Sequence, residues 1–272
     1  MNCARTMAPA AKTTVIIKPL DITMLAGSNR ISFIGLPGSG KSTILMSMLL
    51  ELRHNYATVV ACSSSECDNK FYRRRIPRSL VYDEFSKKTV ARFINRQQAM
   101  NKRTLRCKRN KNSLLILDDC FDDVSVLDNK LMRMLYKRGR HFNSSVWVCQ
   151  QICVDIKPWA RTTTSAVVLM WVNSIRERKI IFENYGSAFS SFDEFNKIYE
   201  DVATSQPYTA MVLLLNREGA TKGVDSVFYY RARDFQADVR ACSKQVWKEA
   251  MERVDPKISA SDFAVIDENE FD

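Results

Sequence analysis

The chain has 272 residues, of which 46% are hydrophobic and 26% charged, with only eight glycines and seven prolines. Such usage excludes fibrous, low-complexity and disordered proteins, and the length suffices to bury a substantial core. Lys and Arg outnumber Asp and Glu by 41 to 30, so the formal net charge is +11. This charge favours a polyanionic partner such as nucleic acid, or else a solvated basic surface.

Short apolar strands and helices alternate along the chain. In chain order, we expect elements at residues 31–34 (strand), 42–53 (helix), 57–62 (strand), 82–102 (helix), 114–117 (strand), 124–138 (helix), 146–149 (strand), 167–172 (strand), 192–203 (helix), 209–215 (strand), 227–231 (strand) and 235–254 (helix). This pattern is typical of a parallel sheet covered on both faces. We therefore predict an α/β fold with a mostly parallel central sheet flanked by helices.

No internal repeat or linker divides the predicted core, so one domain should span residues 29–254. We expect residues 1–28 to form a poorly packed arm with a short strand at 15–17, and 255–272 to form an acidic tail. That tail could dock on a basic partner surface, shield a DNA channel, or serve as a solubilising disordered end.

Cysteine placement argues against disulfides. Three of the eight cysteines, Cys62, Cys120 and Cys149, lie in or beside apolar runs, and the chain has no CxxC pair. Free thiols in a reducing compartment are therefore expected. The amino terminus shows no long apolar stretch, and the longest apolar runs are too short to span a bilayer. These features predict an intracellular protein without a membrane span.

The strongest motif follows the first strong strand, at residues 35–43, and reads GLPGSGKST. It fits the phosphate-loop pattern G-x-x-x-x-G-K-[ST], and it lies between a strand and a helix, as that pattern requires. Its glycines allow backbone N–H groups to face phosphate oxygens at the helix N-terminus. The expected nucleotide-binding residues are Gly35, Pro37, Gly38, Ser39, Gly40, Lys41, Ser42 and Thr43. Lys41 would reach the β- and γ-phosphates, and Ser42 would ligate Mg²⁺.

A second motif, LLILDD at residues 114–119, ends a buried strand with two carboxylates. An acid at this place usually anchors Mg²⁺, a role that we assign to Asp118. Asp119 is then placed to orient or deprotonate a water that attacks the γ-phosphate, or alternatively to cap the next segment.

The next strand ends in Gln150 and Gln151. Either amide could contact the phosphate and the attacking water. Because successive side chains of a strand point to opposite faces, only one of the two would face the site, and the sequence leaves both as candidates. Two arginines flank this strand: Arg140 precedes it and Arg161 follows it. Ring ATPases take positive charge for hydrolysis from a neighbouring subunit, which makes both arginines candidates; surface charge is the plainer alternative.

Basic residues concentrate in two acid-free segments, 70–78 and 95–112. The second could contact DNA phosphates, although this expectation rests on charge alone. Its candidate DNA-contacting residues are Arg96, Lys102, Arg103, Arg106, Lys108 and Arg109.

These motifs, together with RGRHFNSSVWVCQQICVDIKPWAR at 138–161, resemble the DNA-packaging ATPases of nucleocytoplasmic large DNA viruses. The resemblance covers about residues 29–233, and its spacing from Gln to Pro-x-x-Arg favours Gln151. It implies a RecA/FtsK–HerA-like P-loop fold, ATP and Mg²⁺ as cofactors, and a pentameric or hexameric ring. It further implies that double-stranded DNA is pumped into a preformed capsid in the host cytoplasm, with capsid or vertex proteins as partners and the virion as a further location.

Two other functions fit a phosphate loop. A nucleoside or nucleotide kinase would need an acceptor pocket and a lid, which residues 70–111 could supply. A non-motor ATP-dependent assembly switch would bind the nucleotide with little turnover. The paired acids and the glutamine at the strand end favour water as the phosphate acceptor.

Overall fold

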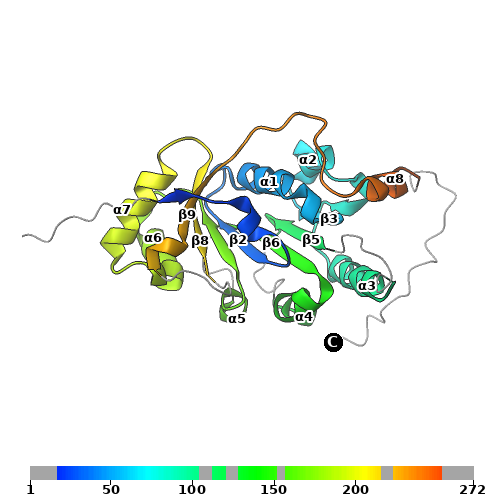
Figure 1. Ribbon diagram of the computed structural model, residues 1–272, viewed down its shortest axis with the longest axis horizontal. Helices are drawn as coiled ribbons and strands as arrows, with labels where there is room; N and C mark the ends of the chain where they lie inside the picture. Colours follow the sequence, from blue (N-terminus) through cyan, green and yellow to red (C-terminus); the bar gives the residue numbers. More distant parts are fainter. Residues whose placement is uncertain (1–16, 104–111, 121–127, 152–156, 216–222, 253–272) are drawn as a thin grey trace, which may run out of the picture.

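The computed structural model describes residues 17–103, 112–120, 128–151, 157–215 and 223–252, and over these residues it shows one nine-stranded sheet (Figure 1). The strands are β1 (Lys18–Pro19), β2 (Arg30–Ile34), β3 (Thr58–Ser63), β4 (Val81–Tyr82), β5 (Ser113–Asp118), β6 (Ser144–Gln150), β7 (Ala166–Leu169), β8 (Thr209–Leu214) and β9 (Val227–Arg231). Their order across the sheet is β1-β9-β8-β7-β2-β6-β5-β3-β4. Only β8 runs antiparallel to its neighbours, so the predicted mostly parallel sheet is confirmed.

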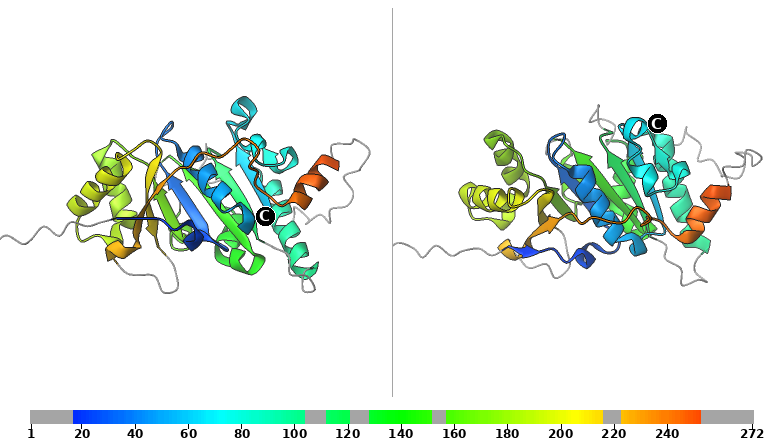
Figure 2. Two further views of the ribbon diagram at one scale, coloured as in Figure 1. Left: turned by 45° about the horizontal axis from the view of Figure 1, so that its top comes forward. Right: turned by 90° about the horizontal axis from the view of Figure 1, so that it is seen from above.

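Helices cover both faces of this sheet. They are α1 (Lys41–Glu51), α2 (Glu66–Asn69), α3 (Lys87–Arg103), α4 (Lys130–Arg138), α5 (Pro158–Arg161), α6 (Ile175–Tyr185), α7 (Phe192–Ala203) and α8 (Lys244–Glu252). In Figure 1, α1 and α2 lie above the sheet, and α3, α4 and α5 lie below it. Helices α6 and α7 cover the β7–β8 end, where Phe195 and Tyr199 pack on Leu169 and Met211. The two further views in Figure 2 show the same layering.

The amino-terminal segment is more ordered than its sequence suggests. From residue 17 onward it is part of the fold: β1 pairs with β9, and Leu20 and Leu25 are buried in the core beside α1. The predicted strand at 15–17 lies almost wholly outside the described residues. The pairing joins residues about two hundred positions apart in sequence, and no local pattern encodes such a contact.

The last helix is shorter than predicted. It begins at Lys244, whereas a helix from residue 235 was expected. The preceding segment is held by Arg75, whose guanidinium donates hydrogen bonds to the carbonyls of Phe235, Gln236 and Val239 at 3.1, 2.5 and 2.8 Å. These side-chain bonds, together with a turn in which Val239 N donates to Gln236 O at 3.1 Å, hold the segment in a non-helical conformation.

Helix α3 also begins later than predicted, at Lys87, because Val81 and Tyr82 pair with β3 as the edge strand β4. Helix α6 was not predicted at all. Its buried residues Ile181 and Tyr185 lie four positions apart and pack against the β7–β8 end, and the Ser174 side chain caps the helix by accepting from Glu177 N.

The five cysteines among the described residues are free: Cys62, Cys67, Cys120, Cys149 and Cys242. Burial raises the pKa of Cys62 to about 12. Within the same residues, every helix is too short or too polar to cross a bilayer.

A hydrogen bond between Asn29 and Trp147 fixes β2 against β6. The indole N–H of the fully buried Trp147 donates to Asn29 Oδ1 at 2.7 Å, and Asn29 is itself only 5% exposed. An unpaired buried donor is costly, so the substitution Asn29→Ala should lower the free energy of unfolding by about 1–3 kcal/mol. The measurement is urea-induced unfolding.

Asn173→Ala is the matched control. Trp171 donates to Asn173 Oδ1 at the same 2.7 Å, but Asn173 is exposed, so water can replace the bond and the loss should be below about 0.5 kcal/mol. Equal losses in the two variants would contradict the role given to burial.

Candidate nucleotide-binding site

The phosphate loop connects β2 to α1, at the edge of the sheet where the parallel strands end. Gly38 and Gly40 have φ values of +76° and +88°, a region that side chains disfavour. A Cβ at Gly35 would lie 2.8 Å from Met170 Cβ, and one at Gly40 would lie 2.7 Å from Tyr208 Cδ1. The glycines of the motif are therefore required by backbone conformation and by close packing.

Polar groups of the loop are available for an anion. The Lys41 side chain is nearly buried, and its Nζ donates to the carbonyl oxygens of Gly35 and Leu36 at 2.7 and 2.9 Å, both neutral acceptors. The buried Ser39 hydroxyl has no hydrogen-bond partner among the described residues. Together with the helix N-terminus, an ammonium and a spare hydroxyl fit the phosphates of a nucleotide.

Two oxygens suited to magnesium meet beside the loop. Ser42 Oγ donates to Asp118 Oδ2 at 2.7 Å, which joins the start of α1 to the end of β5. Mg²⁺ is usually held by one or two protein oxygens together with substrate phosphates, and this pair fits that pattern. Over the described residues, no group of three His, Cys, Asp or Glu side chains could hold a metal by itself.

Asp118 Oδ2 has a second donor that the sequence motifs did not identify. The hydroxyl of Tyr72 donates to it at 2.6 Å, from a turn that follows β3. Burial, and then the nearby carboxylate, raise the pKa of Tyr72 well above its ordinary value, so the phenol remains a donor. No local signal marks Tyr72, because the contact joins residues 46 positions apart.

Asp119 and Gln151 also meet at this edge. Gln151 Nε2 donates to Asp119 Oδ1 at 3.0 Å, and both side chains are exposed. Asp119 adopts a left-handed conformation, with φ of +53°, and Ser64 Oγ donates to its carbonyl oxygen at 2.6 Å. The exposed carboxylate of Asp119 thus directly follows the candidate metal ligand, the exposed amide of Gln151 lies beside it, and both are accessible to water.

Gln150 differs from Gln151 in its surroundings. Its side chain is only 3% exposed, and neither its amide nitrogen nor its amide oxygen has a hydrogen-bond partner among the described residues. Its backbone carbonyl accepts from Gly35 N at 3.1 Å and ties the phosphate loop to β6.

Neither candidate arginine lies near the phosphate loop of its own chain. Arg140 is in the turn Gly139–Phe142 before β6, so the whole length of that strand, about 20 Å, separates it from the site. Arg161 ends α5 shortly before Ser165, whose N donates to Arg30 O at the start of β2. Either arginine could reach a nucleotide only on a neighbouring molecule.

Segment 70–78 and the described part of segment 95–112 lie at opposite ends of the strands. Helix α3 carries Arg96 and the exposed Lys102 toward the edge distant from the phosphate loop, where Asn101 Nδ2 donates to His141 O at 3.2 Å. Side-chain positions of Arg103, Arg106, Lys108 and Arg109 lie outside the described residues.

Segment 70–78 follows β3 and lies at the phosphate-loop edge. Arg73 pairs with Asp83 at 2.7 Å, and Arg75 is engaged by the carbonyls before α8. Its remaining basic residues, Lys70, Arg74 and Arg78, are exposed.

Comparison with known proteins places the chain in a family. The family model described as "Poxvirus A32 protein" matches residues 22–181, more than half of the chain. A protein of Invertebrate iridescent virus 3, named 088R, is 31% identical over 232 residues, which cover 81% of this chain and 86% of that protein. Protein 015R of Frog virus 3 is 30% identical over 237 residues, covering 86% and 71% of the two chains.

Two solved structures are similar to this chain. The conjugation coupling protein TcpA of pCW3, in a monomer form with ATPgS, has a TM-score of 0.51 at 12% identity, covering 84% of this chain and 65% of that one. The genome packaging NTPase B204 of Sulfolobus turreted icosahedral virus 2, in complex with AMPPCP, has a TM-score of 0.49 at 13% identity, covering 76% and 98%. The chain therefore belongs to the poxvirus A32 protein family and is, by family and fold, a P-loop ATPase.

Proposed function

We propose that this chain is an ATP-driven translocase that packages double-stranded viral DNA into a preformed capsid. The observation that carries the proposal is the grouping of Lys41, Ser42, Asp118, Asp119 and Gln151 at one edge of the sheet. ATP would bind at the phosphate loop, and Mg²⁺, held by Ser42 and Asp118, would neutralise charge on the phosphates.

Water is the best-supported phosphate acceptor. Asp119 can accept a proton from water, and Gln151, already hydrogen-bonded to Asp119, can hold that water in place. Both groups are exposed and therefore accessible to water. Hydrolysis is thereby favoured over transfer to a nucleoside.

A ring assembly would complete the site. Arg140 and Arg161 are too far from the phosphate loop to act within one chain, which supports a role toward the nucleotide of a neighbour. A net charge of +11 suits a ring that grips DNA through its phosphates without reading sequence. Five or six subunits, contact with capsid or vertex proteins, and action in the host cytoplasm or in the virion belong to the same proposal.

Steady-state ATP hydrolysis, measured with and without long double-stranded DNA, tests the proposal. Wild-type hydrolysis should rise with DNA, and Asp119→Asn should lower kcat by about 10²- to 10⁴-fold while ATP still binds, because the general base is lost. Asp193→Asn, an exposed acid on α7, is the control and should behave as wild type.

Other outcomes identify the alternatives. Phosphate transfer to a nucleoside or nucleotide, with no response to DNA, would establish a kinase. Turnover that stays very slow on DNA in the assembled oligomer would indicate an assembly switch.

The two glutamines can be separated by substitution. Gln151→Ala should lower kcat about a hundredfold with little change in KM for ATP, because a group that orients water is lost. Gln150→Met removes an amide that has no partner among the described residues, so kcat and the unfolding free energy should stay near wild type. A loss of kcat in Gln150→Met, with kcat kept in Gln151→Ala, would assign the water-orienting role to Gln150.

DNA contact by residues 95–112 is tested by the double substitution Arg103→Ala with Arg106→Ala. Loss of two phosphate contacts should weaken DNA binding and reduce the slope of log K against log salt by about 2, while basal ATP hydrolysis is kept. Arg74→Ala with Arg78→Ala is the comparison at the opposite end of the strands. Unchanged affinity of the first variant at low salt would contradict the assignment.

A further inference from the structure

A buried tyrosine contacts the carboxylate that is expected to hold magnesium. Tyr72 is 1% exposed and lies in the turn Tyr72–Arg74 between β3 and β4. Its hydroxyl donates to Asp118 Oδ2 at 2.6 Å, and the Ser42 hydroxyl donates to the same oxygen at 2.7 Å. The orientation of the Asp118 carboxylate therefore has two supports, one from α1 and one from the turn.

The turn is itself held by a buried carboxylate. Glu66, at the start of α2, is fully buried; its Oε2 accepts from Tyr72 N at 2.8 Å and its Oε1 accepts from Arg73 N at 2.9 Å. A buried carboxylate is costly unless its oxygens are paired, and these two backbone donors pair both. The backbone of Tyr72 is thereby fixed relative to β3.

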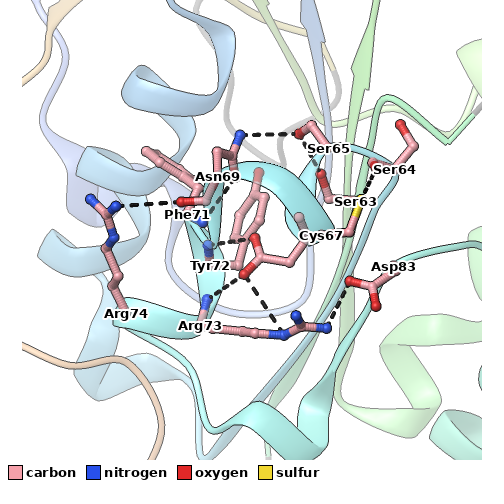
Figure 3. A network of polar contacts seen from close by, with 11 residues as sticks. Ser63, Ser64, Ser65, Cys67, Asn69, Phe71, Tyr72, Arg73, Arg74 and Asp83 are labelled. Atoms are coloured by element: carbon pink, nitrogen blue, oxygen red, sulfur yellow. Dashed lines mark hydrogen bonds and ion pairs between the residues drawn. The ribbon is translucent and has the colours of Figure 1, made fainter.

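Arg73 ties the same turn to Asp83, which directly follows β4. Its guanidinium lies 4.0 Å from Glu66 Oε1 and 2.7 Å from Asp83 Oδ1, as Figure 3 shows for Arg73 and Asp83. Asn69 adds a further bond, since its Oδ1 accepts from Phe71 N at 2.9 Å. The turn is therefore tied to its surroundings on both sides of Tyr72.

Packing alone does not account for the hydroxyl. The Tyr72 ring packs edge-on against Phe71, with centroids 5.2 Å apart, and phenylalanine would make the same contact. A buried phenol needs an acceptor, and here the acceptor is the carboxylate beside the phosphate loop.

We propose that Tyr72 is a positioning residue for Asp118, and that Glu66 holds Tyr72 in place. This inference rests on the proposed function only in taking Asp118 as the magnesium ligand. The phenol would keep the carboxylate in one orientation, so that it need not be reordered when the metal–nucleotide complex binds.

The test is the magnesium dependence of nucleotide binding in Tyr72→Phe. A fluorescent ATP analogue is titrated first in EDTA and then at increasing Mg²⁺, and ATP hydrolysis is measured over the same Mg²⁺ range. The Mg²⁺ concentration for half-maximal binding should rise about tenfold, the effect of one hydrogen bond to a charged group, while affinity in EDTA stays at the wild-type value.

Tyr56→Phe is the matched control. Tyr56 is also 1% exposed, and its hydroxyl contacts Asn29, far from Asp118 in the fold. This variant should keep the wild-type Mg²⁺ curve. Glu66→Gln leaves one side-chain oxygen to accept the two backbone bonds from Tyr72 N and Arg73 N. The Mg²⁺ concentration for half-maximal binding should therefore rise in this variant too, but by less than in Tyr72→Phe.

Several results would overturn the inference. One is a Tyr72→Phe curve that coincides with that of Tyr56→Phe; another is an equal loss of affinity with and without Mg²⁺, which would indicate a damaged fold. Nucleotide binding that ignores Mg²⁺ in the wild type would remove Asp118 as a ligand and the inference with it. Absence of DNA-stimulated hydrolysis, with the Mg²⁺ shift intact, would overturn only the proposed translocase.

Discussion

The hydrogen bond between Ser42 and Asp118 is the contact on which the site depends. It joins the first turn of α1 to the carboxyl end of β5, although β6 lies between β2 and β5 in the sheet. Every other group at the site is placed relative to this pair: Lys41 precedes Ser42, and Asp119 follows Asp118. An oxygen pair held in this way suits a hard divalent cation before any nucleotide arrives.

The order of the strands explains how distant motifs converge. Parallel β2, β5 and β6 all end at the same edge, and β6 is central, so its last residues lie between the phosphate loop and the paired acids. Gln151 and Arg140 flank opposite ends of β6. Gln151 is therefore at the site, whereas Arg140 is a strand length away from it. A single chain thus brings together the candidate phosphate-, metal- and water-contacting groups, but neither Arg140 nor Arg161.

Much of this could be predicted from the sequence, for reasons that differ by residue. The phosphate loop and LLILDD follow local rules of turn and strand, and α7 and β9 begin and end where the sequence pattern indicates. Contacts that join remote segments could not be predicted. Tyr72 reaches Asp118 only once β3 and β5 pair. Helix α8 begins later than expected because Arg75, 160 residues or more earlier in the chain, binds the carbonyls of the segment before it. Strand topology likewise decides at which end of the strands segment 70–78 and helix α3 lie.

The turn that carries Tyr72 has a thermodynamic consequence. Two residues further along, Arg74 is exposed to solvent, so one short segment contacts both the surrounding solution and the buried carboxylate of Asp118, the candidate metal ligand. With the role proposed for Asp118, a ligand of Arg74 that displaces this segment changes the affinity of Asp118 for the cation. Linkage then requires the cation to change the affinity of that ligand by the same factor, although the two never touch.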